Sequence, residues 1–381
     1  MPAEIQSFDV TDRRNIHKFV KVPWQIYQDD PAWVPPLIKE RMDLLSPKHP
    51  YFEHARARFW IARDNGRAVG RISAQYDQIK PSSVKQSIGY FGMFDCIDDQ
   101  EVASRLFESA ENWLKEQGCE LVRGPFSLSI NQESGLLVDG FEQSPFIMMG
   151  HARKYFQELV KRAGYDKAKD LYAWFIHTDF ENPPAMQRLI ERYKDRILIR
   201  DLDKKNFDHD MKVMLDIFNN SWANNWGFIP FTQNEFHHMG KEMIQLIPPD
   251  HIKIAMVDGQ PVGMIGLLPN FNEIIKDLNG RLFPLGVFRL LWRLKFSWPK
   301  SGRVALLGIR QEYQNQMMGS ALAFMLIGET KKVAASKGMT AHEMSWVLED
   351  NDRLNKILES LGGVRYKTYR IFEKNLDVKS G

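Results

Sequence analysis

Apolar and polar positions along this chain form a pattern that occurs twice. Residues 61–72 and 254–265 each consist of an apolar run, a two-residue turn and a second apolar run, and six of the twelve aligned positions are identical. The turns are Asn-Gly at 65–66 and Asp-Gly at 258–259, and such pairs readily take up the positive φ angles of a tight hairpin. The pattern therefore predicts one antiparallel hairpin at the same relative place in each half of the chain.

A second pair of segments follows the hairpins in the same order. In each half, apolar residues at helical spacing run up to a glycine, Gly164 or Gly362, and an apolar strand follows. Glycine is common just past the last turn of a helix because it tolerates the left-handed conformation. The two pairs of segments are offset by 193 and 198 residues, so duplication of one fold explains them better than chance does.

Between these anchors, both halves predict a strand, a helix and a second strand. The ranges are 89–97, 100–117 and 120–123 in the first half and 304–309, 320–336 and 340–346 in the second. Each half also begins with helices and closes with a helix and a strand. This order predicts an α+β fold with a mixed, mostly antiparallel sheet and flanking helices.

Length and composition support two globular domains. A chain of 381 residues is too long for one ordinary core, and a composition of 44% hydrophobic and 26% charged residues is typical of a globular protein. The Asn-Pro-Pro break at 182–184 follows the last strand of the first repeat. We therefore expect domains at 1–192 and 193–381.

Charge and cysteine content narrow the class of protein. The net charge of +3 is too small and too evenly spread to predict a nucleic-acid partner. Cys96 and Cys119 lie in apolar or periodic segments, which predicts reduced, buried thiols and a cytoplasmic location. The histidines lack the spacing of zinc ligands, so we expect no metal site. Neither a signal peptide nor a membrane-spanning run is expected.

The order of elements and two local motifs in the second half resemble the GNAT superfamily of N-acyltransferases. In that family a loop of pattern R/Q-x-x-G-x-G/A leads from the fourth strand into the third helix. Its backbone N–H groups hold the pyrophosphate of CoA. The matching segment here is LLGIRQEYQNQMMGSALAFML, 306–326. Two registers are open: one places Gln314, Met317 and Gly319 on the motif, and the other places Gln316, Gly319 and Ala321 there.

The second motif is an asparagine eleven residues before the glycine that closes the last helix, matched by Asn351 and Gly362. Seven residues after that asparagine, the family usually has a tyrosine that acts as general acid toward the departing CoA thiolate. This chain has Leu358 at that position. The possible substitutes are Tyr366 and Tyr369, both in the following strand, and we take Tyr366 as the candidate. In the first half the corresponding helix begins with acidic residues at 98, 99 and 101, so we expect only the second half to bind CoA.

The resemblance implies an acyl-CoA site in the second half, made by the end of the fourth strand, the loop and the motif asparagine. The implied cofactor-binding residues are Leu307, Gly308, Ile309, Gln314, Asn315, Gln316, Met317, Met318, Gly319, Ser320 and Asn351.

Transfer of an acyl group to an amine also needs a base, usually a carboxylate. Glu343, within the fifth strand, is the first candidate, and Glu312, just before the loop, is the second. The alternative for both is an ordinary solvent-facing carboxylate.

Two segments could contribute to an acceptor site. The irregular stretch 124–141 offers Asn131 and Glu133 as pocket residues, unless these side chains cap turns of their own loop. Trp226 and Phe228 could hold an apolar acceptor, or they could pack in the core, as aromatic residues usually do.

An insertion at 270–302 separates the second hairpin from the next strand. Its part at 282–298 is both apolar and basic, which could allow peripheral contact with a membrane or let it cover a lipid-like substrate. The alternative is a helix packed within the protein with its arginines in solvent.

These inferences combine in one predicted function. We expect a cytoplasmic, acyl-CoA-dependent N-acyltransferase that transfers an acetyl or longer acyl group directly to a small or lipid-like amine, as a monomer or homodimer. A non-catalytic protein that binds acyl-CoA or another metabolite, and an aminoacyl-tRNA-dependent transferase, are the alternatives.

Overall fold

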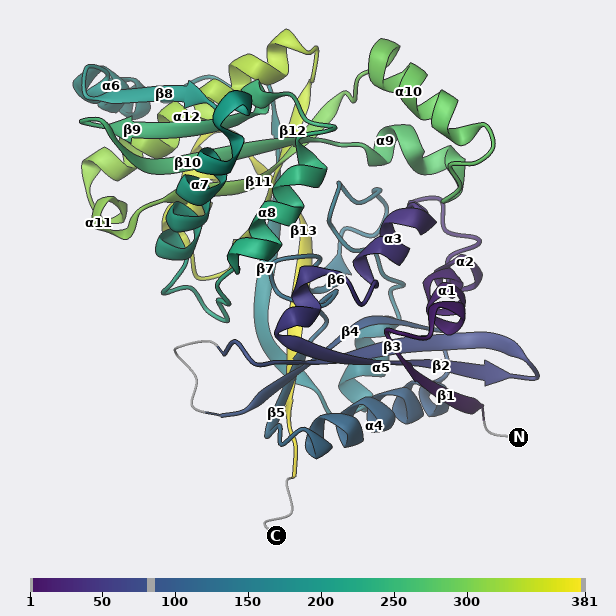
Figure 1. The fold of residues 1–381 in the computed structure, drawn as a ribbon. Coiled ribbons are helices and arrows are strands. Elements are labelled where there is room, and N and C mark those ends of the chain that lie inside the picture. Colours follow the sequence, from purple (N-terminus) through teal and green to yellow (C-terminus); the bar gives the residue numbers. More distant parts are fainter. Residues whose placement is uncertain (1–2, 81–85, 378–381) are drawn as a thin grey trace. The chain divides into compact units, whose positions relative to one another are not determined.

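The computed structural model of the protein describes residues 3–80 and 86–377 (Figure 1). Its described residues fall into two compact units that interleave along the chain. Unit 1 comprises Met1–Leu171, Ile274–Trp292 and Lys367–Gly381, and unit 2 comprises Tyr172–Glu273 and Arg293–Tyr366. The expected boundary at 192 describes the two sequence repeats and stays a prediction. The compact units are divided differently: unit 1 includes segments after residue 192, and unit 2 includes residues before it.

Unit 1 contains a sheet whose last strand comes from the end of the chain. The strands are β1 (Glu4–Asp9), β2 (Ala55–Asp64), β3 (Arg67–Asp77), β4 (Ile88–Cys96), β5 (Leu121–Gly124) and β6 (Leu136–Asp139). β13 (Val364–Asn375) pairs with β5 through Phe372 and Gly124 and also pairs with β6. The order is β1-β2-β3-β4-β5-β13, and only β4 and β5 pair in parallel.

The helices of unit 1 lie between and after these strands. They are α1 (Arg13–Lys21), α2 (Pro23–Ile26), α3 (Ile38–Leu44), the 3-10 turn η1 (Pro50–Glu53), α4 (Gln100–Glu116) and α5 (Phe156–Arg162). The insertion forms α9 (Asn272–Ile275), η4 (Lys276–Leu278) and α10 (Gly286–Phe296).

Unit 2 repeats the arrangement of strands. The order is β7-β12-β11-β10-β9-β8, and the parallel pair is β11 with β12. The strands are β7 (Asp166–His177), β8 (Ile197–Asp201), β9 (Ile252–Val257), β10 (Gln260–Pro269), β11 (Ser301–Ile309) and β12 (Ala341–Leu348). The mixed, mostly antiparallel sheet expected from the sequence is therefore confirmed.

Helices cover both faces of the unit 2 sheet, so the sheet has a core on each side. They are α6 (Pro184–Tyr193), η2 (Lys204–Asn206), α7 (Phe207–Ser221), α8 (Gln233–Met243), η3 (Pro249–His251), α11 (Gln311–Gln314), α12 (Met317–Ser336) and α13 (Asp352–Ser360). Met264 packs in the core with α7 and α8, whereas its neighbour Ile265 packs in the core with α12. This alternation follows from the two-residue period of a strand.

The six elements expected between the repeat anchors all form, with ends within three residues of the predicted ones. Both expected hairpins form as well. Their turn residues have positive φ angles, +46° and +80° at Asn65 and Gly66 and +49° and +81° at Asp258 and Gly259. These are the angles of the tight turn that Asn-Gly and Asp-Gly favour.

The turn at Gly259 gives a stability prediction. A Cβ at this position meets nothing within 4 Å, so Gly259→Ala isolates the cost of a positive φ, roughly 1–2 kcal/mol. Gly328→Ala is the matched control, because residue 328 lies inside α12 with open space around it, and alanine is favoured there by about 1 kcal/mol. Urea unfolding should show the first variant destabilised and the second stabilised; equal stabilities would contradict the turn geometry.

Candidate active site

Strands β11 and β12 part within unit 2. Their parallel pairing runs from Ser301 opposite Ala341 to Val304 opposite Met344, whereas β11 continues to Ile309 and β12 to Leu348. Over the same stretch β11 stays paired with β10. We call the opening between 305–309 and 345–348 the β11–β12 fork.

The fork exposes backbone hydrogen-bonding groups of β11. The N–H of Arg310 donates to the carbonyl of Val262 in β10 (2.9 Å). Because successive N–H groups of a strand point to opposite edges, the N–H groups of Ile309 and Leu307 face the fork. Of the three strand residues predicted for CoA, these two present a donor there, while Gly308 lies against the indole ring of Trp222.

The first turn of α12 lies at the end of the predicted loop and has no side-chain cap. Its N-cap is Gln316, whose side chain makes no capping hydrogen bond with the described residues. The first N–H groups of any helix lack partners inside the helix, which here means those of Met317, Met318 and Gly319. Together with the helix dipole of a 20-residue helix, they form a site suited to an anion.

A glycine is required at 319 because the chain folds back on itself there. A Cβ on Gly319 would lie 2.0 Å from the carbonyl oxygen of Tyr313. Both sequence registers place a motif glycine at this residue. The side chain of Met317, which one register puts at the middle glycine, is 54% exposed and points into solvent.

Arg353, which the sequence analysis missed, adds a positive charge beside this helix start. It is half-buried in the first turn of α13, and its Nη2 donates to the carbonyl of Gln316 (3.0 Å) and to Oγ of Ser320 (2.5 Å). Its position two residues after the motif residue Asn351 is the signal that could have identified it.

The corresponding helix of unit 1 begins differently. The side chain of Asp99 caps α4 by accepting hydrogen bonds from the N–H groups of Glu101 (2.8 Å) and Val102 (3.2 Å). The donors that could hold an anion are therefore already satisfied by a carboxylate of the chain itself. This contrast agrees with the expectation that only the second half binds CoA, which stays a prediction.

A buried polar network lies where the fork begins. Glu343 is fully buried and stands opposite Arg303 in the β11–β12 register. One carboxylate oxygen of Glu343 accepts a hydrogen bond from Oγ of Ser345 (2.5 Å), and the other accepts one from the hydroxyl of Tyr366. Nε of Arg303 lies 3.8 Å from the first of these oxygens and donates to Oγ of Ser345 (2.7 Å). The structure thus brings two of the three predicted catalytic residues together.

The third predicted catalytic residue is not part of this network. Glu312 is exposed on the short helix α11. Arg303 and Ser345 were missed by the sequence analysis. They share a network with Glu343 because residues 343 and 345 lie on one face of β12 and residue 303 pairs with 343 across the parallel strands.

Several predicted loop residues have structural contacts. Nε2 of Gln314 donates to the carbonyls of Ser221 and Ile309, both at 2.8 Å, and so ties the loop to the end of β11. Asn351 caps α13 by accepting from the N–H of Leu354 (3.2 Å). Asn315 is exposed, whereas Met318 is buried.

The predicted acceptor residues of unit 2 lie after α7. Trp226 and Phe228 are both half-buried, and the ring of Phe228 packs 6.0 Å from that of Phe218 in the core around α7. Phe228 thus packs against that core, and an acceptor role for Trp226 and Phe228 stays a prediction.

The predicted acceptor residues of unit 1 belong to a loop with its own polar contacts. Glu133 pairs with the guanidinium of Arg41 and accepts a hydrogen bond from Oγ of Ser127 (3.2 Å). Burial acts to raise the pKa of Glu133, but the neighbouring Arg41 outweighs it, and the pKa lies below its ordinary value. Asn131 is half-buried in the same loop, where its N–H donates to Oγ of Ser129 (3.2 Å).

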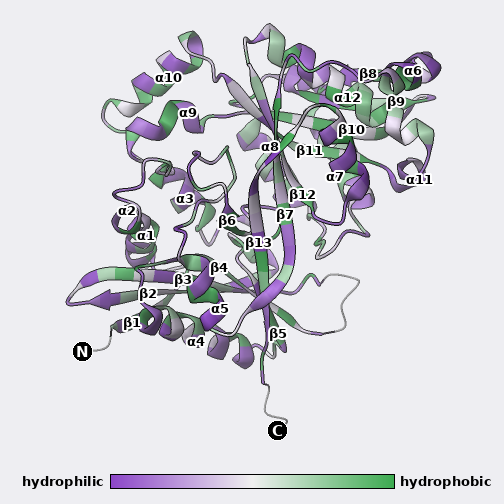
Figure 2. Ribbon diagram, turned by 180° about the vertical axis from the view of Figure 1, so that it is seen from behind, coloured by the Kyte–Doolittle hydropathy of each residue, from purple (hydrophilic) through white to green (hydrophobic). Residues whose placement is uncertain are grey.

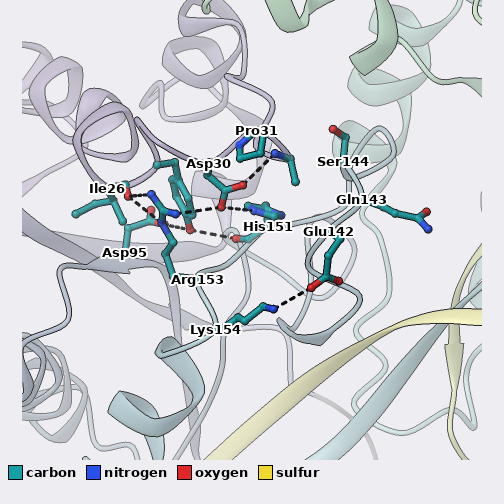
Figure 3. A network of polar contacts seen from close by, with 12 residues as sticks. Ile26, Asp30, Pro31, Asp95, Glu142, Gln143, Ser144, His151, Arg153 and Lys154 are labelled. Atoms are coloured by element: carbon teal, nitrogen blue, oxygen red, sulfur yellow. Dashed lines mark hydrogen bonds and ion pairs between the residues drawn. The ribbon is translucent and has the colours of Figure 1, made fainter.

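A second polar network in unit 1 joins the first helices to the loop before α5 (Figure 3). Asp30 accepts from Nε2 of His151 (2.9 Å), and Arg153 donates to the carbonyl of Ile26 (2.7 Å). Burial lowers the pKa of His151 against the opposing effect of Asp30. Each charged group here is matched by a partner, so the network fixes the position of the loop.

None of the helices in the described part of the chain combines the length and apolar character that crossing a bilayer requires. Among the same residues, no three histidine, cysteine or acidic side chains group around a point where a metal ion could bind.

His342, next to Glu343 in β12, gives a pH prediction. It is 4% exposed, and burial lowers its pKa from 6.5 to about 4. Below pH 6.5 the unfolded chain takes up a proton that the folded one excludes, so stability is lost as the pH falls toward 4. Relative to His342→Leu, the wild-type free energy of unfolding should fall by about 2 kcal/mol between pH 7.5 and 5. Parallel pH profiles in urea unfolding would contradict this.

Comparison with known proteins identifies two relatives that match along almost the whole chain. Protein YghO of Escherichia coli (strain K12) is 43% identical over 366 residues, covering 96% of this chain and 94% of the relative. Bacterial ceramide synthase of Caulobacter vibrioides is 39% identical over 377 residues, covering 98% of each chain. No protein-family model matches the chain.

Solved structures resemble the fold at low sequence identity. A tandem GNAT protein from the clavulanic acid biosynthesis pathway superposes with a TM-score of 0.56 at 9% identity, over 98% of both chains. A GCN5-related N-acetyltransferase from Sphaerobacter thermophilus gives 0.53 at 13% identity, over 98% of this chain and 96% of that one. The GNAT-like fold that the sequence resemblance implied is thereby confirmed, and the chain belongs to the family of Protein YghO and bacterial ceramide synthase.

Proposed function

We propose that the chain is an N-acyltransferase that moves an acyl group from acyl-CoA to the amine of a long-chain, lipid-like amino alcohol. The uncapped start of α12, with Arg353 beside it and the β11–β12 fork leading to it, carries the proposal. The acceptor class is suggested by the relative named bacterial ceramide synthase, since a ceramide is the amide of a fatty acid and a long-chain amino alcohol.

The residues at the fork fit acyl-CoA in charge and in hydrogen-bonding capacity. The N–H groups of Met317 to Gly319 and the guanidinium of Arg353 would hold the pyrophosphate. The N–H groups of Leu307 and Ile309 would face the pantetheine arm and the thioester carbonyl. Oγ of Ser221, at the end of α7, is buried without a hydrogen-bond partner among the described residues, and it lies near Gly308 of β11. Bound acyl-CoA supplies the activated acyl thioester.

Glu343 and Tyr366 would handle the proton released by the amine. As the new C–N bond forms and the C–S bond breaks, the amine must lose a proton and the leaving thiolate must gain one. The hydroxyl of Tyr366 is the mobile link, because it donates to Glu343 while its ring is only half-buried. Glu343 would take up the amine's proton through that hydroxyl, and the hydroxyl would then return it to the CoA thiolate, while Arg303 and Ser345 hold the carboxylate in place.

Location and assembly remain part of the proposal. We place the reaction in the cytoplasm, which suits the two free, buried cysteines, Cys96 and Cys119. A monomer or a homodimer suffices, because all residues assigned to the acyl-CoA site lie in unit 2 of one chain.

An assay with two substrate series tests the function. Purified protein is incubated with acetyl- to palmitoyl-CoA and with either sphinganine or a short amine, and the amide and free thiol are measured. We expect amide only with the long-chain amino alcohol, and a drop in kcat of at least tenfold in Tyr366→Phe with unchanged acyl-CoA affinity. If acyl-CoA binds but no substrate combination yields an amide, the protein is a binding protein and not an enzyme. If acyl-CoA does not bind, the proposed acyl-CoA site is wrong.

Gly319→Ala tests the anion site separately from the chemistry. The added Cβ cannot be accommodated 2.0 Å from the carbonyl of Tyr313, so the loop must move away from the helix start. Calorimetry should show at least a tenfold loss of acyl-CoA affinity. Gly328→Ala, further along the same helix with open space around it, is the matched control and should bind as the wild type does. Equal affinities of the two variants would place the pyrophosphate elsewhere.

A further inference from the structure

The insertion exposes an unusual number of large hydrophobic side chains. Of the eleven such side chains that are exposed in the described part of the chain, six fall between residues 283 and 296. They are Phe283, Leu285, Phe288, Leu291, Trp292 and Phe296. We call residues 283–296, the turn and helix α10 together, the α10 segment. Apolar side chains gathered in this way usually mark a surface that binds something.

Helix α10 has two apolar faces, and only one of them is sheltered. Val287, Leu290 and Leu294 follow a three- and four-residue spacing and are half-buried. The other apolar stripe begins at Phe288, which is 70% exposed, and continues with Leu291 and Trp292, which are 59% and 60% exposed. Figure 2 shows hydrophobic and hydrophilic residues in close succession along this helix. An apolar helix face that stays exposed to water after the helix has packed is expected to contact a membrane or another molecule.

The charged residues of the α10 segment have one sign. From Leu278 to Gln311 the chain contains no aspartate or glutamate. Within α10 the basic residues are Arg289, Arg293 and Lys295, and Lys295 falls on the exposed stripe, seven residues after Phe288. The long stem of a lysine can lie along an apolar surface while its charge reaches the polar boundary. Such a surface is complementary to a layer that has an apolar interior and negatively charged groups at its boundary with water.

We propose that the α10 segment docks on the surface of an anionic bilayer, with α10 parallel to the membrane plane. The aromatic and leucine side chains of its exposed stripe enter the boundary between head groups and acyl chains, and the basic residues contact anionic head groups. Eleven residues of helix span only about 16 Å, well short of a bilayer core. The proposal goes beyond the transferase function and does not depend on it.

Vesicle flotation with the full-length protein tests this docking. Vesicles of phosphatidylcholine alone are compared with vesicles that contain one third phosphatidylglycerol, at low and at high salt. We expect the wild type to float with the anionic vesicles, with a partition coefficient at least tenfold higher than with neutral ones. High salt should reduce that ratio, because it screens the basic residues.

Two double variants distinguish docking through the α10 segment from non-specific adsorption of exposed hydrophobic side chains. Phe288→Ser with Leu291→Ser removes the exposed stripe and should lower partitioning at least tenfold. Leu198→Ser with Leu246→Ser also removes two exposed leucines, on β8 and after α8, and should leave partitioning unchanged. Because all four side chains are exposed, urea midpoints should stay close to wild type, which keeps a loss of binding distinct from unfolding.

Three outcomes would overturn the proposal. These are equal partitioning of the two double variants, equal partitioning into neutral and anionic vesicles, and a dimer in light scattering that the Phe288 and Leu291 variant alone dissociates. The last would show that a second copy of the chain covers the stripe. Amide formation in detergent-free solution with the same variant reports separately on the transferase.

Discussion

The parting of β11 from β12 is the constraint on which the candidate site depends. Two parallel strands normally satisfy each other's backbone groups along their whole length, and here they stop doing so after Val304 and Met344. Arg303 and Glu343 face each other one pair before that point, and Ser345 links them. Charges buried in this way are stable only with several hydrogen bonds around them. The network therefore holds the strands together at the base of the fork, while the backbone beyond it is left open.

The two halves of the chain use equivalent helices in opposite ways. Asp99 closes the start of α4, so that helix is complete in itself. The start of α12 has no such side chain, and a cation, Arg353, lies beside it. One capping side chain would be enough to let a copy of a duplicated fold keep its architecture without an anion site, because it satisfies the donors that a ligand would otherwise need.

The sequence predicted most of what depends on short-range patterns. The hairpins, the helix from 100 and the closing glycines follow from residue types a few positions apart, and all of them form. Glu343 and Tyr366 were predicted singly, but their contact depends on how β12 and β13 come together. Arg303 and Arg353 were not predicted, because their partners are distant in sequence. Arg303 contacts Ser345, 42 residues away, and Arg353 contacts Ser320, 33 residues away. The start of α12 at 317 in place of 320 has a similar origin, since Gln316 is a weak capping residue and gives no local signal.

The strand β13 has a consequence for how the protein is made. It supplies residues 367–375 to the sheet of unit 1, where it covers the free edge of the four-residue strand β5. During synthesis, residues 121–124 leave the ribosome long before their partner exists. The N-terminal sheet therefore carries an open edge until residues 367–375 have been added, and such edges readily pair with other chains. Completion of the first unit is thus tied to synthesis of residues 367–375, although its sequence is nearly all in the first half.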